Sequence, residues 1–522
     1  MPPTLPDQQQ PSPAADPFLP REAPLARQRT FPALVARIPP LARAPAGDRG
    51  RLVVVSNRVA DLSASHQSGG LAVAVGEALR ATGGLWCGWS GRTSHEAWWG
   101  APTIRNFGRI RTATIDLTPA EAAGFYCGFS NGCLWPVLHE RLDLAEIRRQ
   151  DEKPYFAVNE RMAALLDSLL QPGDRIWVHD YHFMPLGEAL RRRSIRQAIG
   201  FFLHTPFPSP ETFRALPAHE ALARALFAYD VVAFQTRQDR ENFARYVEEA
   251  LGGRRLDEER LSAFGQILRV HACPIGIDAA AFAETARMNA DAPEIAGLAH
   301  WLGGRGLIAG VDRLDYSKGL PERLRGLETL LEQDPRFHRR VSLLQVAPPT
   351  REGVECYDRV RREFEQLVGR INGAHGDLGW VPVQYLHRPL PRALLAAVLR
   401  LARVGLVTPL NDGMNLVAKE YVAAQDAADP GVLVLSRFAG AAEQMQEAVL
   451  VNPHDPHEVA DGLRRALTMR AGERRDRHQA LWRRVATQDV AWWRERFLSA
   501  LEDASGARIA ATAPIAAMSM AG

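Results

Sequence analysis

Residues 405–420 read GLVTPLNDGMNLVAKE, and the most informative pattern of the chain lies in them. The apolar run Gly405 to Thr408 has the length and the β-branched content of a buried parallel strand. A turn follows from Pro409 to Gly413, and the spacing predicts a helix that begins at Met414. The first-turn amides of a helix have no intrahelical partner, so they can bind a phosphate, and Gly413 lets that phosphate approach the backbone closely.

Glu420 extends this pattern along the predicted helix. It lies about two turns in, roughly 10 Å from the turn at 1.5 Å per residue, which is the span from a nucleotide's diphosphate to its ribose hydroxyls. A carboxylate there can accept hydrogen bonds from both hydroxyls. An ordinary strand and helix with a surface glutamate would have the same spacing, so the other motifs must separate these two interpretations.

Length, charge and cysteine pattern limit the class of protein. A chain of 522 residues is too long for one core and predicts two domains. With 63 basic and 60 acidic side chains the net charge is +3, which gives no basic field for nucleic acid or a membrane surface. The five cysteines are odd in number and never form a CxxC pair, which argues against disulfides and against zinc. They are Cys87, Cys127, Cys133, Cys273 and Cys356. We therefore expect a cytoplasmic protein with no metal and no cofactor.

The two ends of the chain differ from the rest. Residues 1–50 contain twelve of the 36 prolines and no sustained apolar period, which predicts a disordered Pro-rich arm. Residues 506–522 are interpreted as a disordered tail. The sequence shows no signal-peptide core and no run that approaches the ~20 apolar residues of a membrane span.

From Arg51 onward, strands alternate with amphipathic helices, which predicts an α/β fold with mostly parallel sheets. We assign residues 51–285 to an N-terminal Rossmann-like domain, 286–480 to a C-terminal one, and 481–505 to a helix that packs back on the domains. Trp482, Trp492, Trp493 and Phe497 are the aromatic side chains that this last stretch must bury. The predicted strands are 52–56, 85–87, 109–117, 175–178, 199–203, 231–234 and 267–272 in the first half, and 307–311, 341–346, 381–385, 405–408, 432–435 and 448–451 in the second.

Polar clusters follow the predicted strands, where ligands of doubly wound sheets bind. The clusters are Ser56 to Arg58, Ser68 to Gly70, His179 to His182, His204 to Pro208 and Arg313 to Gly319. Two His at i and i+3 in a tight turn seldom converge on one ion, so we predict no metal there. Arg313 and Lys318 can neutralise a departing diphosphate, although two solvated cations would give the same pattern.

Longer strings carry a resemblance to a known family over about Arg51 to Phe497. They are RLVVVSNR, SGGLAV, FSNGCLWP, WVHDYHFMPL, GFFLHTPFPSPE, VDRLDYSKGLPER, GRINGAHG and DGMNLVAKEYVAAQ. The chain resembles glycosyltransferase family 20, the family of the trehalose-6-phosphate synthases. The resemblance implies a GT-B fold, in which two Rossmann-like doubly wound domains face each other across a cleft. It also implies a retaining enzyme (EC 2.4.1.15) that moves glucose from UDP-glucose, or another nucleotide-glucose, to glucose 6-phosphate.

The same resemblance implies the site residues, position by position. On the acceptor side, Arg58, Tyr126 and Arg351 would hold the 6-phosphate, Trp135 would lie against the sugar, and Asp180 would bind sugar hydroxyls. Residues 349–352 read PTRE where the family commonly has Ser and Gly around the Arg, which weakens the assignment of Arg351.

On the donor side, the resemblance gives each position a separate role. Gly70 belongs to a flexible glycine loop, His204 lies at the donor glucose, Arg313 and Lys318 clamp the diphosphate, Asp412 binds the donor sugar, Gly413, Met414, Asn415 and Leu416 offer amides to the phosphates, and Glu420 binds the ribose. Asp180, His204, Arg313, Lys318 and Asp412 form the implied catalytic set.

Several rival functions stay open at this stage. An enzyme like glucosylglycerol-phosphate synthase would use glycerol 3-phosphate as its acceptor, and a GT-B epimerase would need no acceptor. An NAD-dependent oxidoreductase would need a GxGxxG after its first strand, and that motif is absent there. A non-catalytic sugar-phosphate sensor would not need a clamp for a leaving group. We expect a homo-oligomer, while the sequence leaves the nucleotide base and the regulation undetermined.

Overall fold

The structure is a computed structural model that describes residues 50–62, 70–95, 101–350 and 355–512. The predicted Pro-rich arm up to residue 49, the residues just before Gly70, the predicted phosphate ligand Arg351 and the tail from residue 513 lie outside the described residues. All described residues belong to one compact unit.

The first sheet is a doubly wound sheet with antiparallel edges. Its strand order is β3-β4-β2-β1-β5-β6-β7-β10-β9-β8, and the pairs from β4 through β10 are parallel. The strands are β1 (Leu52–Arg58), β2 (Gly84–Thr93), β3 (Thr103–Phe107), β4 (Ile110–Leu117), β5 (Arg175–His179), β6 (Ala198–Phe202), β7 (Val231–Phe234), β8 (Arg254–Arg255), β9 (Arg260–Ala263) and β10 (Gln266–Ala272).

The second sheet is parallel throughout, with the order β13-β12-β11-β14-β15-β16. Its strands are β11 (Gly306–Val311), β12 (Val341–Val346), β13 (Val383–Leu386), β14 (Val404–Val407), β15 (Val432–Ser436) and β16 (Val449–Val451). The α/β fold class and the two mostly parallel sheets predicted from the sequence are therefore confirmed.

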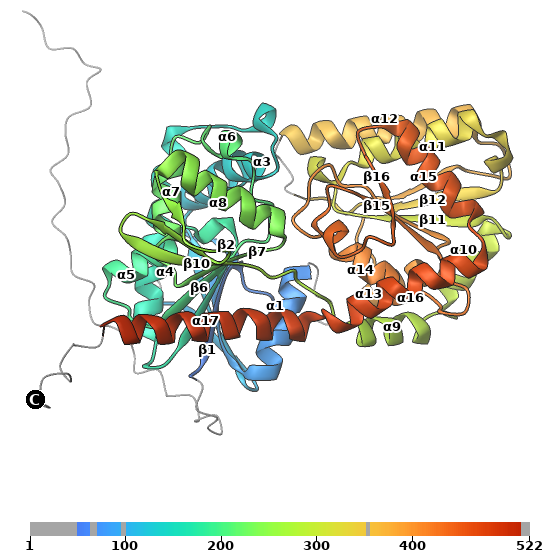
Figure 1. Cartoon of the computed structure of the whole chain (residues 1–522). Coiled ribbons are helices and arrows are strands. Elements are labelled where there is room, and N and C mark those ends of the chain that lie inside the picture. The colour runs from blue at the N-terminus through green and yellow to red at the C-terminus, as the bar shows by residue number, and fades with distance from the viewer. Residues whose placement is uncertain (1–49, 63–69, 96–100, 351–354, 513–522) are drawn as a thin grey trace, which may run out of the picture. The chain divides into compact units, whose positions relative to one another are not determined.

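Helices cover both faces of each sheet (Figure 1). Those of the first half are α1 (Gly70–Thr82), α2 (Pro119–Glu121), η1 (Ala122–Leu134), α3 (Trp135–Leu138), η2 (Leu142–Leu144), α4 (Arg149–Leu169), η3 (Tyr181–Phe183), α5 (Leu186–Arg192), α6 (Pro210–Phe213), α7 (His219–Leu226) and α8 (Arg237–Leu251). Those that follow are α9 (Ala279–Met288), α10 (Pro293–Leu302), η4 (Tyr316–Lys318), α11 (Leu320–Gln333), η5 (Pro335–Phe337), α12 (Glu355–His375), α13 (Arg392–Leu401), α14 (Leu416–Ala424), η6 (Gly440–Glu443), α15 (Pro456–Thr468), α16 (Ala471–Thr487) and α17 (Val490–Thr512).

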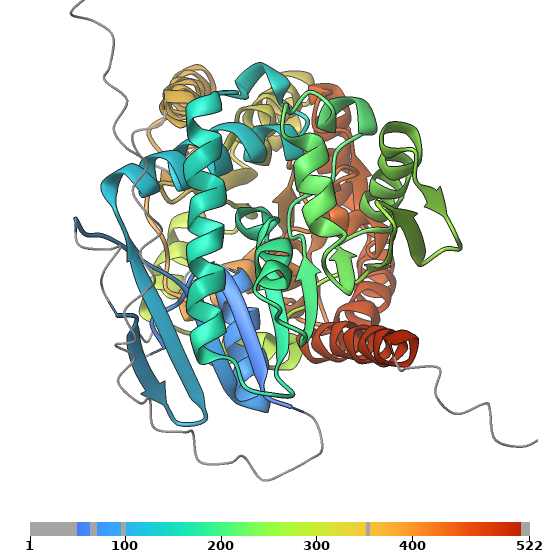
Figure 2. The same ribbon diagram turned by 90° about the vertical axis from the view of Figure 1, so that its left-hand side faces the viewer.

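The unbroken apolar run at the start of β1 explains why it forms a central strand. Val53 and Val55 are buried in one core cluster with Tyr155 of α4, while Val54 is buried in the cluster on the other side with Phe497 of α17. Successive side chains of a strand point to opposite faces, so an unbroken apolar run requires cover on both. Figure 2 shows α4 in front of the first sheet and the end of α17 on the other side.

The C-terminal helix α17 returns to the first sheet, as its aromatic content predicted. Trp493 and Phe497 are fully buried, and the ring centroids lie 4.7 and 4.5 Å from that of Trp177 on β5. Gly200 of β6 permits this contact, because a Cβ at that position would lie 2.5 Å from Phe497. The helix continues to Thr512, beyond the end at residue 505 that the sequence suggested.

The link between the sheets runs through residues 273–278, which connect β10 to α9. Helix α9 packs against α13 and α14 of the second half. The proposed domain boundary at residues 285 and 286 falls inside α9, near the end of that helix. The structure also contains β3 and the short pair β8 and β9, which the sequence did not predict.

Candidate functional site

The loop between β14 and α14 carries the predicted phosphate seat, with one correction. Helix α14 begins at Leu416, so the predicted start at Met414 is wrong by two residues. Asn415 is the N-cap: its backbone has φ +74°, and its side-chain Oδ1 accepts a hydrogen bond from the N–H of Ala418 at 3.3 Å. An N-cap residue must leave helical geometry, and Asn tolerates positive φ better than most residues.

The last part of the loop is held through carbonyl groups that accept hydrogen bonds from η6. Gly440 donates to the carbonyl of Asp412 at 2.8 Å, and Ala441 donates to that of Met414 at 2.8 Å. Within the described part of the chain, the N–H groups of residues 413–417 donate to no other residue. A row of such N–H groups at a helix start binds anions.

Gly413 brings this loop against the first half of the chain. A Cβ there would lie 2.1 Å from the carbonyl oxygen of His204, so only glycine permits the contact. His204 therefore lies beside the loop between β14 and α14.

Side-chain contacts connect the loop to two other segments of the second half, η4 and the end of β11. Lys318 in η4 forms an ion pair with Asp412. The side-chain amide of Asn415 donates to Oδ2 of Asp412 at 3.1 Å and to Oδ1 of Asp312 at 3.4 Å. The predicted donor residues Lys318, Asp412 and Asn415 are thus neighbours in the structure.

His204 is held as a neutral imidazole. The N–H of Ile275 donates to Oε1 of Gln235 at 2.9 Å, so the amide nitrogen of Gln235 donates to Nδ1 of His204 at 3.2 Å. His204 then carries its proton on Nε2 and donates to Nδ1 of His179 at 3.0 Å. Burial lowers the pKa of His204 to about 3, since desolvation disfavours the imidazolium.

Asp180 lies next to His204. Its backbone has φ +74°, and its Oδ1 accepts a hydrogen bond from the N–H of His204 at 3.3 Å. A non-glycine residue with positive φ is uncommon and is often associated with function.

The predicted acceptor residues form an aromatic and cationic group. Arg58, at the end of β1, places its guanidinium 4.6 Å from the ring centroid of Trp89 and 5.4 Å from that of Tyr126. Tyr126 lies on η1, a run of wide π-helical turns, which are rare and frequent at functional sites. Gly91 leaves the space that the guanidinium occupies, because a Cβ there would be 2.9 Å from Arg58.

Trp135, a predicted acceptor residue, lies beside Arg313, a predicted donor residue. The exposed Arg313 lies with its guanidinium carbon 5.9 Å from the Trp135 ring centroid, although the two come from different halves of the chain. The structure therefore brings Trp135 and Arg313 together.

Glu420 is half-buried on α14, one residue after the fully buried Lys419. Burial raises the pKa of Glu420 to about 7, and the positive charge of Arg392 partly opposes that rise. A carboxyl group poised near neutral pH fits a ligand-binding position better than an exposed surface position.

Sequence reasoning missed several residues beside the site. Trp89 lies beneath Arg58, Gln235 fixes the tautomer of His204, and the fully buried Arg323 bonds to Asp312. Arg323 and Asp312 belong to the quoted string VDRLDYSKGLPER, so that string contained the signal. Gln235 follows a predicted strand, and no motif around it indicated a functional role.

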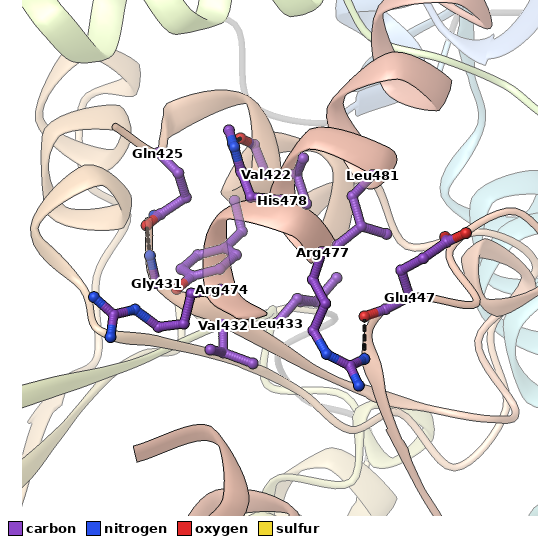
Figure 3. Close-up of a pocket in the computed structure, with 11 residues that line it drawn as sticks. Val422, Gln425, Gly431, Val432, Leu433, Glu447, Arg474, Arg477, His478 and Leu481 are labelled. Atoms are coloured by element: carbon purple, nitrogen blue, oxygen red, sulfur yellow. Dashed lines mark hydrogen bonds between the residues drawn. The ribbon is translucent and has the colours of Figure 1, made fainter. Parts of the chain in front are cut away.

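Two cavities of the structure lie away from this group of residues. The enclosed one in Figure 3 lies between α14, β15 and α16, and its lining includes Tyr421, Gln425 and His478. Its volume of about 10 Å³ is room for one water molecule at most. The open one, of about 340 Å³, is lined by residues that include Gly376 and Trp380, and it lies near the amino end of β13. Neither cavity is at the carboxyl ends of the strands.

Among the described residues, one group has ligand atoms close enough to hold a metal ion: Glu328, Glu332 and His375. Glu328 is already paired with Arg370 at 2.6 Å. The five cysteines are free thiols, and none of the described helices is long and apolar enough to cross a membrane.

The loop of residues 413–417, at the carboxyl end of one doubly wound sheet, lies against His204 at the carboxyl end of a strand of the other, and ligands of such sheets bind at these ends. The fold and site define a glycosyltransferase of the GT-B class.

The model of Glycosyltransferase family 20 matches residues 49–503, and the chain belongs to this family. The chain is similar to the trehalose-6-phosphate synthase of Citrobacter koseri, with 45% identity over 87% of this chain and 95% of that one. It is also similar to the crystal structure of a UDP-forming α,α-trehalose-phosphate synthase from Burkholderia xenovorans in complex with glucose 6-phosphate. The TM-score is 0.83, with 44% identity over 87% of this chain and all of that one. An E. coli structure bound with UDP-2-fluoro glucose has the same TM-score and identity, and the match covers 87% of this chain and 99% of that one.

Proposed function

We propose that this chain is a retaining glucosyltransferase that moves glucose from UDP-glucose to glucose 6-phosphate and releases α,α-trehalose 6-phosphate and UDP. The observation that best supports it is the proposed donor loop, where the amides of residues 413–417, which donate to no other described residue, adjoin the Lys318–Asp412 ion pair. Relatives have been solved with glucose 6-phosphate and with a UDP-glucose analogue, which supports both substrates.

The donor half of the proposal follows from charge. When the bond between glucose C1 and the diphosphate oxygen breaks, negative charge grows on the diphosphate. Lys318, Arg313 and the loop amides would stabilise that charge, because fixed cations and N–H groups need little reorganisation as it develops. Asp412, held by Lys318 and Asn415, would accept hydrogen bonds from the donor sugar.

The transfer step is proposed to occur on one face of the sugar. The acceptor hydroxyl forms the new bond to C1 as the diphosphate leaves, and its proton passes to the departing diphosphate oxygen. His204 is unsuited to take that proton, since Nδ1 accepts from Gln235, Nε2 carries a proton and the pKa is about 3. Asp180 would orient the acceptor hydroxyls.

The acceptor phosphate is assigned to Arg58 and Tyr126, with Trp135 against the sugar and Arg351 as a further proposed ligand. Arginine suits a phosphate because its planar fork forms paired hydrogen bonds. We further propose that Glu420 binds the ribose and that the loop of Gly70 closes over the donor.

A panel of substrates tests this function. The purified protein is incubated with UDP-, GDP- or ADP-glucose and with glucose 6-phosphate, glycerol 3-phosphate or no acceptor, and the products are identified by mass spectrometry. We expect the disaccharide phosphate and an equal amount of nucleoside diphosphate with glucose 6-phosphate alone. Transfer to glycerol 3-phosphate would identify the sibling activity, and binding without any transfer would identify a sensor.

We also propose that the protein is cytoplasmic and forms a homo-oligomer. The five free thiols fit a reducing compartment. The number of subunits is left open by the sequence, and light scattering coupled to size-exclusion chromatography measures it.

A further inference from the structure

Arg323 is a cation with no contact with solvent. It lies in the first turns of α11, is 0% exposed, and points toward the carboxyl ends of the central strands of the second sheet. A buried charge is costly unless it is paired and hydrogen-bonded. Its partners therefore indicate why it is there.

Three side chains from three strands satisfy the guanidinium. Its nitrogens donate to Oδ2 of Asp312 at 2.6 Å, to Oε1 of Gln345 at 2.9 Å and to Oγ1 of Thr408 at 3.0 Å. Asp312 follows β11, Gln345 lies in β12 and Thr408 follows β14. All three are buried, and a Cβ at Gly310 would lie 2.8 Å from the guanidinium, so glycine leaves the space it needs.

The network continues from Asp312 into the proposed donor site. Oδ2 of Asp312 is held by Arg323, while Oδ1 accepts from the side-chain amide of Asn415 at 3.4 Å. The same amide nitrogen donates to Asp412 at 3.1 Å, and Asp412 pairs with Lys318. The amide of Asn415 therefore bridges two carboxylates, each of which is paired with its own cation.

The alternation of cations and carboxylates in this network has an electrostatic consequence. Two carboxylates bridged by one amide would repel each other without the flanking cations. Arg323 neutralises the buried one, and Asp312 then fixes the amide of Asn415 from behind. The orientation of Asp412 is thus set by a side chain that no substrate can reach.

We propose that Arg323 is a positioning residue for glucosyl transfer, which acts through Asp312 and Asn415 to hold Asp412 and Lys318 in their working orientation. The inference rests on the proposed function, because it has Arg323 position the residues proposed to bind the donor in that reaction. It differs from a purely structural role, in which Arg323 would only stabilise the second sheet.

A double-mutant cycle between Arg323→Lys and Asn415→Ser separates the two roles. Lysine keeps the charge but loses the planar fork, while serine keeps an N-cap oxygen and loses the bridging amide. Each single change should lower kcat by about 10- to 100-fold, as expected for losing a hydrogen bond to a charged group. The Kd for UDP, measured by calorimetry, should rise by a smaller factor than kcat falls, since only the contact through Lys318 is disturbed while the loop amides are retained.

The double variant gives the decisive value. If Arg323 acts through Asn415, kcat of Arg323→Lys/Asn415→Ser should lie within about threefold of the worse single variant, since the same path is already broken. If the two losses multiply, or if UDP binding falls as much as kcat, Arg323 has a separate structural role and the inference is wrong.

A matched control is available in the first sheet, at the amino ends of two central strands. Arg51 forms a two-pronged pair with the buried Asp174, at 3.1 and 2.7 Å, at the amino ends of β1 and β5. Arg51→Lys makes the same change to a pair with one buried partner, away from the site, and should leave kcat within about twofold of wild type. An equal loss of kcat in Arg51→Lys and Arg323→Lys would contradict the inference.

The design does not depend on one variant folding. If Arg323→Lys fails to fold, Thr408→Val takes its place in the cycle, because it removes only one of the three acceptors of Arg323. Thr408→Val should lower kcat several-fold. This loss should again not multiply with that of Asn415→Ser. A wild-type protein that turns over while all site variants retain its kcat contradicts this inference alone. A wild-type protein that transfers no glucose contradicts the proposed function instead.

Discussion

Glu420 shows how strongly its surroundings alter a single site residue. Burial raises its pKa to about 7, so near neutral pH the free enzyme holds a mixture of the carboxylate and the neutral acid. In the proposed ribose contact, only the carboxylate can accept hydrogen bonds from both hydroxyls. As pH falls through about 7 the carboxylate is lost, so donor affinity should fall with it.

The change Glu420→Gln tests that role. We expect the KM for the donor to rise roughly 10- to 150-fold, because a hydrogen bond to a charged group contributes about 1.5 to 3 kcal/mol. The acceptor KM should change little, and the pH dependence of the donor KM between pH 6 and 8 should disappear. Initial rates over both substrates at three pH values measure all of this, and an equal effect on both substrates would disprove the ribose assignment.

Arg58 is the residue that should distinguish a phosphorylated acceptor from a free sugar. Removing its guanidinium in Arg58→Ala should lower kcat/KM for glucose 6-phosphate by roughly 10- to 150-fold, the loss expected for one charge-assisted bond. Any activity on unphosphorylated glucose should stay unchanged, since glucose never used that contact.

The control for this variant is Arg92→Ala. Arg92 lies in the neighbouring strand β2, and its guanidinium is exposed and 3.6 Å from Asp116. It should leave kcat/KM for both acceptors within about twofold of wild type, as is usual for an exposed pair. If Arg58→Ala lowers both acceptors by the same factor, Arg58 acts on the donor or on folding, and the phosphate pocket must lie elsewhere.

At the scale of elements, the packing of helix α17 on the first sheet can be tested by mutation. Phe497 is fully buried against Trp177 and Gly200. Phe497→Ala should lower the free energy of unfolding by about 3 to 5 kcal/mol, the cost of truncating a buried phenylalanine. Urea unfolding measures it, and Glu495→Ala on the exposed face of the same helix is the control. A loss below about 1 kcal/mol would mean that α17 is not part of the core.

The elements also show what the sequence could predict. Central strands such as β1 are apolar throughout and are covered on both faces, so their pattern was unambiguous. Strand β3 is mostly exposed at a sheet edge, and β8 consists of two exposed arginines, so neither carries an apolar period. The start of α14 was displaced because Asn415 adopts positive φ and bonds to Asp312, more than a hundred residues earlier, which local spacing cannot reveal.

The candidate site divides in the same way. Positions inside long family-like strings, such as Lys318 and Asp412, were predicted and lie together. Two residues beside the site make contacts between separate segments: Arg323 donates to Thr408 and Gln235 donates to His204. Arg323 stands in a family-like string, but its contacts, like those of Gln235, depend on the packing of strands and helices and not only on the order of residues.

At the scale of the whole molecule, the leaving charge is proposed to be met by cations and amides of the chain alone. Turnover should therefore survive exhaustive dialysis against EDTA, with kcat within about twofold of the untreated enzyme. Metal analysis of the dialysed protein is the control. Loss of turnover that Mg²⁺ or Mn²⁺ specifically restores would show that an ion shares this role, and would direct attention to the His179 to His182 turn.

The central claim is that the whole chain transfers a glucosyl group to glucose 6-phosphate with retention. The most direct measurement supplies UDP-glucose labelled with ¹³C at C1 together with unlabelled glucose 6-phosphate and follows the label by NMR. We expect the label in the α-glucosyl unit of an α,α-linked disaccharide phosphate, with one UDP released for each linkage formed. Label in free glucose, in a β-linked product, or in any product formed without glucose 6-phosphate would contradict the claim.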